Sequence, residues 1–210
     1  LNILHGNDSS SKVILLQAGV YNIYAPIDFA LLSVIALIGV SKDSTIINIG
    51  DVENPISNVS LENISFKLSP VTIGGSIINS STSIKSVDII NTTLYTNFIA
   101  ITYSKNIIDV YINGALIALN HCSDFVNVKI DNTVGDTTAG GYVMNECTNG
   151  SNISIHIQPD QDGISNSSFI SNVEIYGASI VNNIAFYKCN NITNAQIYSF
   201  SVAVSGVFYA

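Results

Sequence analysis

The chain has 210 residues, of which only 10% are charged, and its formal net charge is −8. All seven basic residues are scattered lysines, so the chain lacks both the basic patch that binds nucleic-acid phosphates and the guanidinium clamp for carboxylate or phosphate substrates. Hydrophobic residues make up 47%, but no apolar run approaches the roughly 18 residues of a membrane-spanning helix. We therefore expect a packed chain of single-domain size with no nucleic-acid partner and no membrane span.

The first predicted element is a short strand motif in which a polar, mostly small residue precedes an apolar, a variable and an apolar residue. Such alternation is typical of half-buried strands, and almost no stretch shows the i, i+3, i+4 spacing of an amphipathic helix. Nine copies follow one another at spacings of 18 to 28 residues, which is the range of solenoid repeats. The copies begin at Lys12, Ser33, Asn58, Ser86, Asp109, Asn127, Asn152, Asn172 and Asn194.

The repeat also keeps a column register outside the motif. Two residues before most copies stands a large apolar residue, and only Gly150 breaks this column. All three cysteines, Cys122, Cys147 and Cys189, stand five residues before a copy. Units this short cannot bury an apolar face alone and must stack on their neighbours.

We therefore predict an all-β solenoid, a parallel β-helix of about nine turns. Further strands at 98–102, 141–145 and 184–187 complete the turns. Leucine-rich repeats are disfavoured because their L-x-x-L-x-L-x-x-N spacing is missing, and a β-sandwich because its strands would not keep one register for so long. One inward stack is expected to contain Val87, Val110, Val128, Ile153 and Val173.

The segment 12–47 resembles the opening of the pectin-lyase-like superfamily of right-handed parallel β-helices. It contains an L-x-x-G-x-Y strand at 16–21, a rung at Val34–Gly39 and an S-T-I-I strand at 44–47. The resemblance implies a single-stranded right-handed parallel β-helix over nearly the whole chain. The superfamily includes polysaccharide lyases and hydrolases as well as viral tailspikes and surface adhesins, so the resemblance implies a fold and not an activity.

The chain is expected to form one domain over residues 1–210. Residues 1–11 would form an N-terminal cap, 12–199 the stacked rungs, and 200–210 an apolar strand that packs on a partner or on residues beyond this chain. Ile14, Leu16, Ile35 and Leu37 are expected to point outward, which predicts a contact surface at this end.

The second and fourth positions after each motif start should point outward as two columns on one sheet face. In the later rungs these columns contain tyrosines beside polar and charged groups, a combination that suits sugars because the rings cover C–H faces and the polar groups bind hydroxyls. An ordinary solvated sheet face is the alternative. The candidate ligand-binding residues are Tyr111, Lys129, Asp131, His156, Glu174, Tyr176 and Tyr198.

A catalytic role is less favoured. Asp131 and Glu174, with His156 between them, are the residues that would serve an enzyme, but the acids stand singly and no Arg is present, so the superfamily's lyase and hydrolase patterns do not transfer. No catalytic residue is therefore predicted outright. The cysteines lack C-x-x-C spacing and are expected to be free buried thiols, so neither a metal nor a cofactor is expected.

Two further expectations concern asparagines. Asn63, Asn91 and Asn132 share one position after the motif and are expected to form an internal amide ladder. Nine N-x-S/T triplets, which are potential glycosylation sites, occur, and they favour an extracellular or cell-surface location.

The favoured function is a structural and glycan- or receptor-recognition module of an extracellular, virion or cell-surface assembly, such as a tailspike, tail fibre or adhesin. Its partners would be a host-surface glycan or receptor and further copies in a homo-oligomer or a larger assembly. The alternative is a polysaccharide lyase or glycoside hydrolase of the same superfamily.

Overall fold

A computed structural model describes residues 11–50, 56–68, 75–91, 98–132, 141–157, 161–177, 184–199 and 208–209. Within them the chain forms strands and one 3-10 helix, η1 (Phe29–Leu32). No helix in this part of the chain is long and apolar enough to cross a membrane. The predicted 1–11 cap and the 200–210 strand lie largely outside the described residues.

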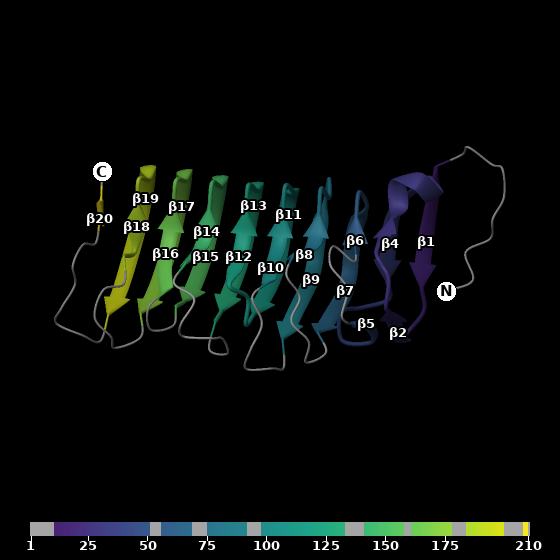
Figure 1. Cartoon of the computed structure of the whole chain (residues 1–210). Helices are drawn as coiled ribbons and strands as arrows, with labels where there is room; N and C mark the ends of the chain where they lie inside the picture. Colours follow the sequence, from purple (N-terminus) through teal and green to yellow (C-terminus); the bar gives the residue numbers. More distant parts are fainter. Residues whose placement is uncertain are drawn as a thin grey trace.

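The strands stack into two parallel sheets that run along a rod (Figure 1). The main sheet has eleven strands, nine of which follow the order β1-β4-β7-β9-β11-β13-β15-β17-β19 while β2 and β5 pair beside them. Its strands are β1 (Lys12–Leu16), β2 (Gly19–Ile23), β4 (Val34–Gly39), β5 (Thr45–Ile49), β7 (Ser60–Leu68), β9 (Ile84–Asn91), β11 (Lys105–Asn113), β13 (Ser123–Asp131), β15 (Thr148–His156), β17 (Ser168–Gly177) and β19 (Asn190–Ser199).

The second sheet has nine shorter strands in strict chain order. It contains β10 and β14 at the predicted positions, and β18 within the predicted 184–187 segment. Its strands are β3 (Ile27–Asp28), β6 (Ile56–Ser57), β8 (Gly75–Asn79), β10 (Phe98–Thr102), β12 (Ile117–Asn120), β14 (Gly141–Asn145), β16 (Gln161–Ser165), β18 (Phe186–Tyr187) and β20 (Phe208–Tyr209).

The predicted fold class, a right-handed parallel β-helix, is confirmed. From β6 to β19 the two sheets alternate strictly and form about seven regular turns. The prediction of about nine turns differs slightly because the first two motif copies fall in the less regular N-terminal part, where β1 and β2, and again β4 and β5, divide a rung into two strands.

The predicted inward stack is also confirmed. Its five members are directly paired from strand to strand, and each is at most 2% exposed. Along a strand such as β13, the inward residues Phe125 and Val128 are three positions apart, whereas Val128 and Ile130 are two apart.

Residues with left-handed backbone conformation explain this change of period. Every motif copy after Lys12 starts with a residue of positive φ, and in the turn that contains β13 three such residues stand three positions apart, each between inward residues. Asn and Asp tolerate this conformation better than most residues, which accounts for their presence at six of the nine motif starts. The three are His121, Asp124 and Asn127, with φ of 51°, 57° and 57°.

The register predicted for the N-terminal copies is wrong. Ile64 and Ser65 pair with Val87 and Asp88, so the third copy is equivalent to the later ones at Asn63 rather than at Asn58. Leu16 and Leu37, predicted to point outward, are buried in the core at 5% and 2% exposure. The reason is that the divided first rungs place these two strands in a different part of the turn from the later motif strands.

Candidate ligand-binding face

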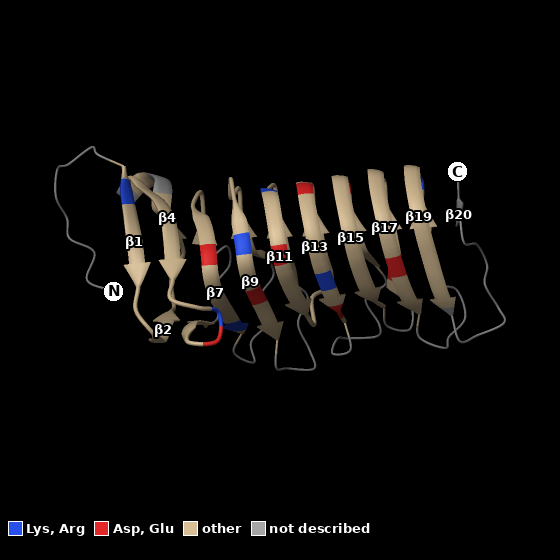
Figure 2. Ribbon diagram, turned by 180° about the vertical axis from the view of Figure 1, so that it is seen from behind, with Lys and Arg blue, Asp and Glu red and all other residues tan. Residues whose placement is uncertain are grey.

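The predicted ligand-binding residues do form two adjacent columns on the main sheet. The first column runs from Tyr111 through Lys129, Ser154 and Glu174 to Gln196. The second column lies two residues further along each strand and contains Asn113, Asp131, His156, Tyr176 and Tyr198. Figure 2 shows Lys, Asp and Glu as isolated segments along this sheet rather than as a continuous charged stripe.

An aromatic ridge occupies the C-terminal end of the second column. The rings of His156 and Tyr176 stack with centroids 4.6 Å apart, and those of Tyr176 and Tyr198 stack with centroids 4.7 Å apart. Tyr176 therefore uses both of its ring faces on its neighbours. The expectation that flat rings would cover sugar faces is wrong for Tyr176, because the ridge presents mainly ring edges to solvent.

Hydrogen bonds fix the two tyrosines toward the first column. The Tyr176 hydroxyl donates to Glu174 Oε2 at 2.9 Å, and the Tyr198 hydroxyl donates to Gln196 Oε1. Donation to the Glu174 carboxylate raises the pKa of Tyr176 above its ordinary value. Tyr176 consequently remains a neutral donor, which orients Glu174 and is unfavourable for a tyrosine nucleophile or base.

A groove of about 340 Å³ lies beside this ridge. Ser154, Glu174 and Gln196 of the first column line it together with asparagines from the motif starts of the same rungs. Of the seven predicted residues only Glu174 lines the groove. The complete lining is Asn152, Ile153, Ser154, Asn172, Glu174, Asn194 and Gln196.

The motif-start residues form an exposed amide ladder along the rod. In each rung the asparagine Nδ2 donates to the side-chain oxygen of the residue at the same position in the preceding rung. The bonds are Asn194 to Asn172 at 2.9 Å, Asn172 to Asn152 at 3.1 Å, Asn152 to Asn127 at 3.1 Å and Asn127 to Asp109 at 2.8 Å. This ladder is not at the position after the motif that the sequence predicts. At the predicted position Asn91 donates to the Gly114 carbonyl and Asn132 to Gln161 Oε1, which do not form one Asn–Asn row.

Charged groups lie at the other end of the first column. Lys129 Nζ lies 5.5 Å from the Tyr111 ring centroid, and Lys42 Nζ forms a 2.9 Å ion pair with Asp88 in the adjacent rung. Burial, followed by the charges of Asp131 and Asp88, raises the pKa of Tyr111. Tyr111 therefore also stays protonated.

The candidate catalytic residues do not form a carboxylate pair. Asp131 and Glu174 occupy different columns two rungs apart, so their Cα atoms are about 12 Å apart by strand spacing. Glu174 instead accepts a hydrogen bond from Tyr176. Asp131 Oδ1 and His156 Nδ1 are buried and have no hydrogen-bond partner within the described residues.

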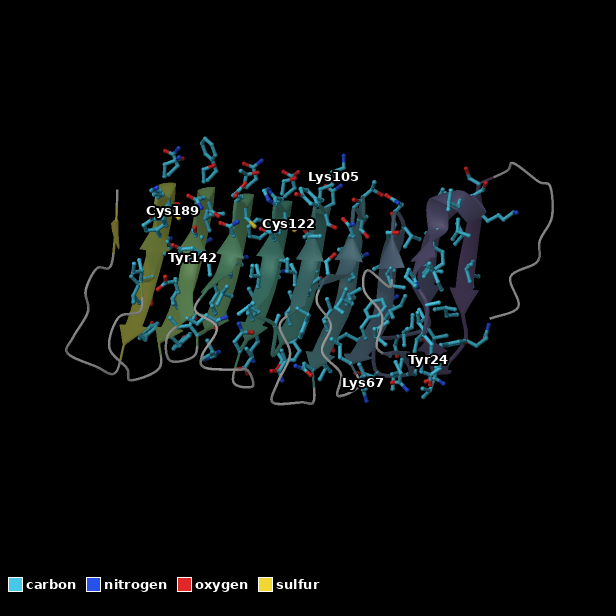
Figure 3. The ribbon with its side chains drawn as sticks, viewed as in Figure 1. Tyr24, Lys67, Lys105, Cys122, Tyr142 and Cys189 are labelled. Carbon is cyan, nitrogen blue, oxygen red and sulfur yellow. The ribbon has the colours of Figure 1, made fainter. Side chains whose placement is uncertain are left out.

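The cysteines are free thiols, as predicted, and Cys122 and Cys147 are buried, whereas Cys189 is only partly buried. Cys122 and Cys147 lie in adjacent rungs of the core, and their Sγ atoms donate to backbone carbonyls. Cys122 and Cys189 lie in one line along the rod (Figure 3). Within the described part of the chain, no three His, Cys, Asp or Glu side chains are grouped to hold a metal ion.

Two further aromatic pairs lie outside the two columns. Tyr103 stacks on His121, whose Nδ1 lies 3.0 Å from Glu146 Oε2. Tyr142 stacks on Tyr187 with centroids 5.6 Å apart. Neither pair lines the groove, and Tyr103 is 62% exposed, so it serves as a control for the ridge tyrosines.

The N-terminal end has a different character. Val13, Leu15, Val20, Leu31 and Ile35 are exposed, although of the four residues predicted to form an outward surface only Ile35 is strongly exposed. A pocket of about 580 Å³ opens among Leu16, Leu37, Ile47 and neighbouring aromatic residues. Core residues line it, so among the described residues this pocket lies at the N-terminal end of the stacked core.

Sequence reasoning missed the asparagines, Ser154 and Gln196. The signal was present, since a polar residue begins every motif copy, but alternation alone does not show that this residue faces outward in a left-handed conformation. The groove therefore lies one column closer to the motif start than predicted.

No protein-family description matches the chain, and no curated protein matches it. Among solved structures, the chain is similar to a pectin methylesterase in complex with hexasaccharide VII, with 11% identity and a TM-score of 0.37 over 96% of this chain and 82% of that one. It is also similar to the A-module of the Azotobacter vinelandii mannuronan C-5 epimerase AlgE6, with 11% identity and a TM-score of 0.31 over 96% of this chain and 92% of that one. At these values we base no activity or site on either similarity. The strand pairing itself confirms the β-helix that the superfamily resemblance predicts.

Proposed function

We propose that this chain is a structural and glycan-recognition module that binds its ligand without cleaving it. The observation that carries the proposal is the groove between the aromatic ridge and the amide ladder. The amide and hydroxyl groups that line the groove suit a ligand that is rich in hydroxyls, and the aromatic ridge beside the groove offers ring edges to its C–H groups.

The stiffness of the fold supports a structural role. Every regular turn is hydrogen-bonded to the next through both sheets, and the large apolar core is continuous along the rod. Such a rod presents the groove at a fixed position, as a tailspike, tail fibre or adhesin would. We therefore also propose an extracellular, virion or cell-surface location.

Association with further subunits is part of the proposal. Core-facing apolar residues in the terminal rungs, such as Ile23 and Ile27 at one end and Ile192 and Ile197 at the other, are only partly buried. Apolar surface and unpaired strand edges at a rod end favour contact with another protein surface.

The test is a panel of soluble oligosaccharides assayed both for binding by calorimetry and for product release by chromatography. We expect saturable binding to at least one glycan and no release of shorter oligosaccharides. Release by the wild type that is abolished in Asp131→Asn or Glu174→Gln would replace this proposal with a lyase or hydrolase. No binding to any glycan would refute the recognition function.

A further inference from the structure

We infer that the groove takes an uncharged, linear polysaccharide that lies along the rod with about one sugar per turn. This inference rests on the proposed function and adds the charge and the direction of the ligand. Three features of the groove carry it: its charge, its hydrogen-bonding groups and its repeat distance.

The charge of the groove disfavours an anionic ligand. Its lining contains one carboxylate, Glu174, and no cationic side chain. The nearest lysine in the first column, Lys129, is in the rung before that of Ser154. Its ammonium lies over the ring of Tyr111, which is one rung further from the groove. The chain as a whole has a net charge of −8. A ligand carboxylate about 5 Å from Glu174 would weaken binding by roughly tenfold or more at the dielectric of a protein surface.

The amide ladder matches hydroxyl groups. Within the ladder, Asn152 and Asn172 each donate one N–H and accept one N–H, which leaves one amide hydrogen and one oxygen lone pair on each side chain. A sugar hydroxyl is both a donor and an acceptor, so it pairs with such an amide without a net charge. A sulfate or carboxylate only accepts and would leave the amide oxygen unmatched.

The repeat distance sets the direction. The aromatic ridge, the first column and the amide ladder all run across β15, β17 and β19, and the ridge rings repeat every 4.6 to 4.7 Å. Adjacent strands are about 4.8 Å apart, and an extended 1,4-linked sugar chain advances by about 5 Å per residue. Each sugar of a chain along the rod would therefore lie beside one residue of the first column and one residue of the amide ladder, with the ridge next to them.

The experiment compares the affinities of neutral and anionic hexasaccharides of similar length. The neutral probes are the 1,4-linked glucose, mannose, galactose and xylose hexamers, and the anionic probes are the galacturonate and mannuronate hexamers. We expect the best neutral hexamer to bind at least about tenfold more tightly than either uronate, with little change in affinity when the salt concentration is raised, because no ion pair forms.

A charge reversal in the groove supplies the second readout. Glu174→Lys should raise uronate affinity by about tenfold or more, whereas Glu146→Lys, which makes the same change in net charge outside the groove lining, should leave the hexamer affinities unchanged. Tighter wild-type binding of a uronate, or an equal response to both variants, would overturn the inference while glycan recognition stands. If no hexamer binds, both the inference and the proposed function fail.

Discussion

Phe125→Ala is expected to lower the free energy of unfolding by about 3 to 5 kcal/mol, the largest effect of any single change considered. Phe125 is fully buried in β13 and pairs with Gly150 of the next rung. Any side chain at Gly150 would overlap the Phe125 ring, which shows that the ring fills the space of both positions. Removing the ring therefore leaves an unusually large void, and denaturant unfolding measures the loss.

Three further variants make this prediction specific. Phe169→Ala removes the same ring from an exposed position and should change stability by less than about 0.5 kcal/mol. Gly150→Ile alone should destabilise the fold by about 1 to 3 kcal/mol through overpacking. In the Phe125→Ala background the same Ile should restore stability, since it refills the column that Ile107 and Ile170 continue on either side. Additive losses in the double variant would contradict this packing.

Tyr176→Ala combined with Tyr198→Ala is expected to weaken glycan binding by about 1 to 3 kcal/mol in total, a factor of roughly 5 to 150 in Kd. The two side chains do not line the groove, but their hydroxyls donate to two residues that do, Glu174 and Gln196, and hold them in place. Because both lie on the outer face of the sheet, the double variant should unfold at nearly the same denaturant concentration as the wild type.

The control is Tyr103→Ala. It removes one partner of another stacked aromatic pair, Tyr103 and His121, which lies outside the two columns beside the groove. Calorimetry should show wild-type affinity for this variant. Wild-type affinity in the double ridge variant would place the ligand on another face of the rod.

The fold was predictable because a stacked β-helix repeats its chemistry in columns. The inward column that includes Val87 and Val173 and the cysteine column could be read from spacing alone, and both are where the repeat places them. Gly150, which breaks the apolar column, is explained only by the structure, since the Phe125 ring of the neighbouring rung occupies its place.

Motif spacing did not predict side-chain orientation in the first two rungs, where each rung is divided into two strands. Leu16 and Leu37 obey the motif but belong to divided rungs, so the shared alternation did not mean a shared orientation. The groove was missed for a related reason. The inward period changes from two to three at residues with positive φ, such as Asn127 and Asn152, and these residues then face outward as the ladder. Backbone conformation of this kind is not visible in an apolar–polar pattern.

We propose that an uncharged glycan occupies the groove beside the ridge. The most direct measurement is a crystal structure of the protein with the tightest-binding neutral hexasaccharide. We predict a sugar chain parallel to the rod across β15, β17 and β19, with hydroxyls bonded to Asn152, Asn172 and Asn194. A chain that runs along the strands, perpendicular to the rod, a chain on another face, or a cleaved product beside Asp131 and His156 would contradict this prediction.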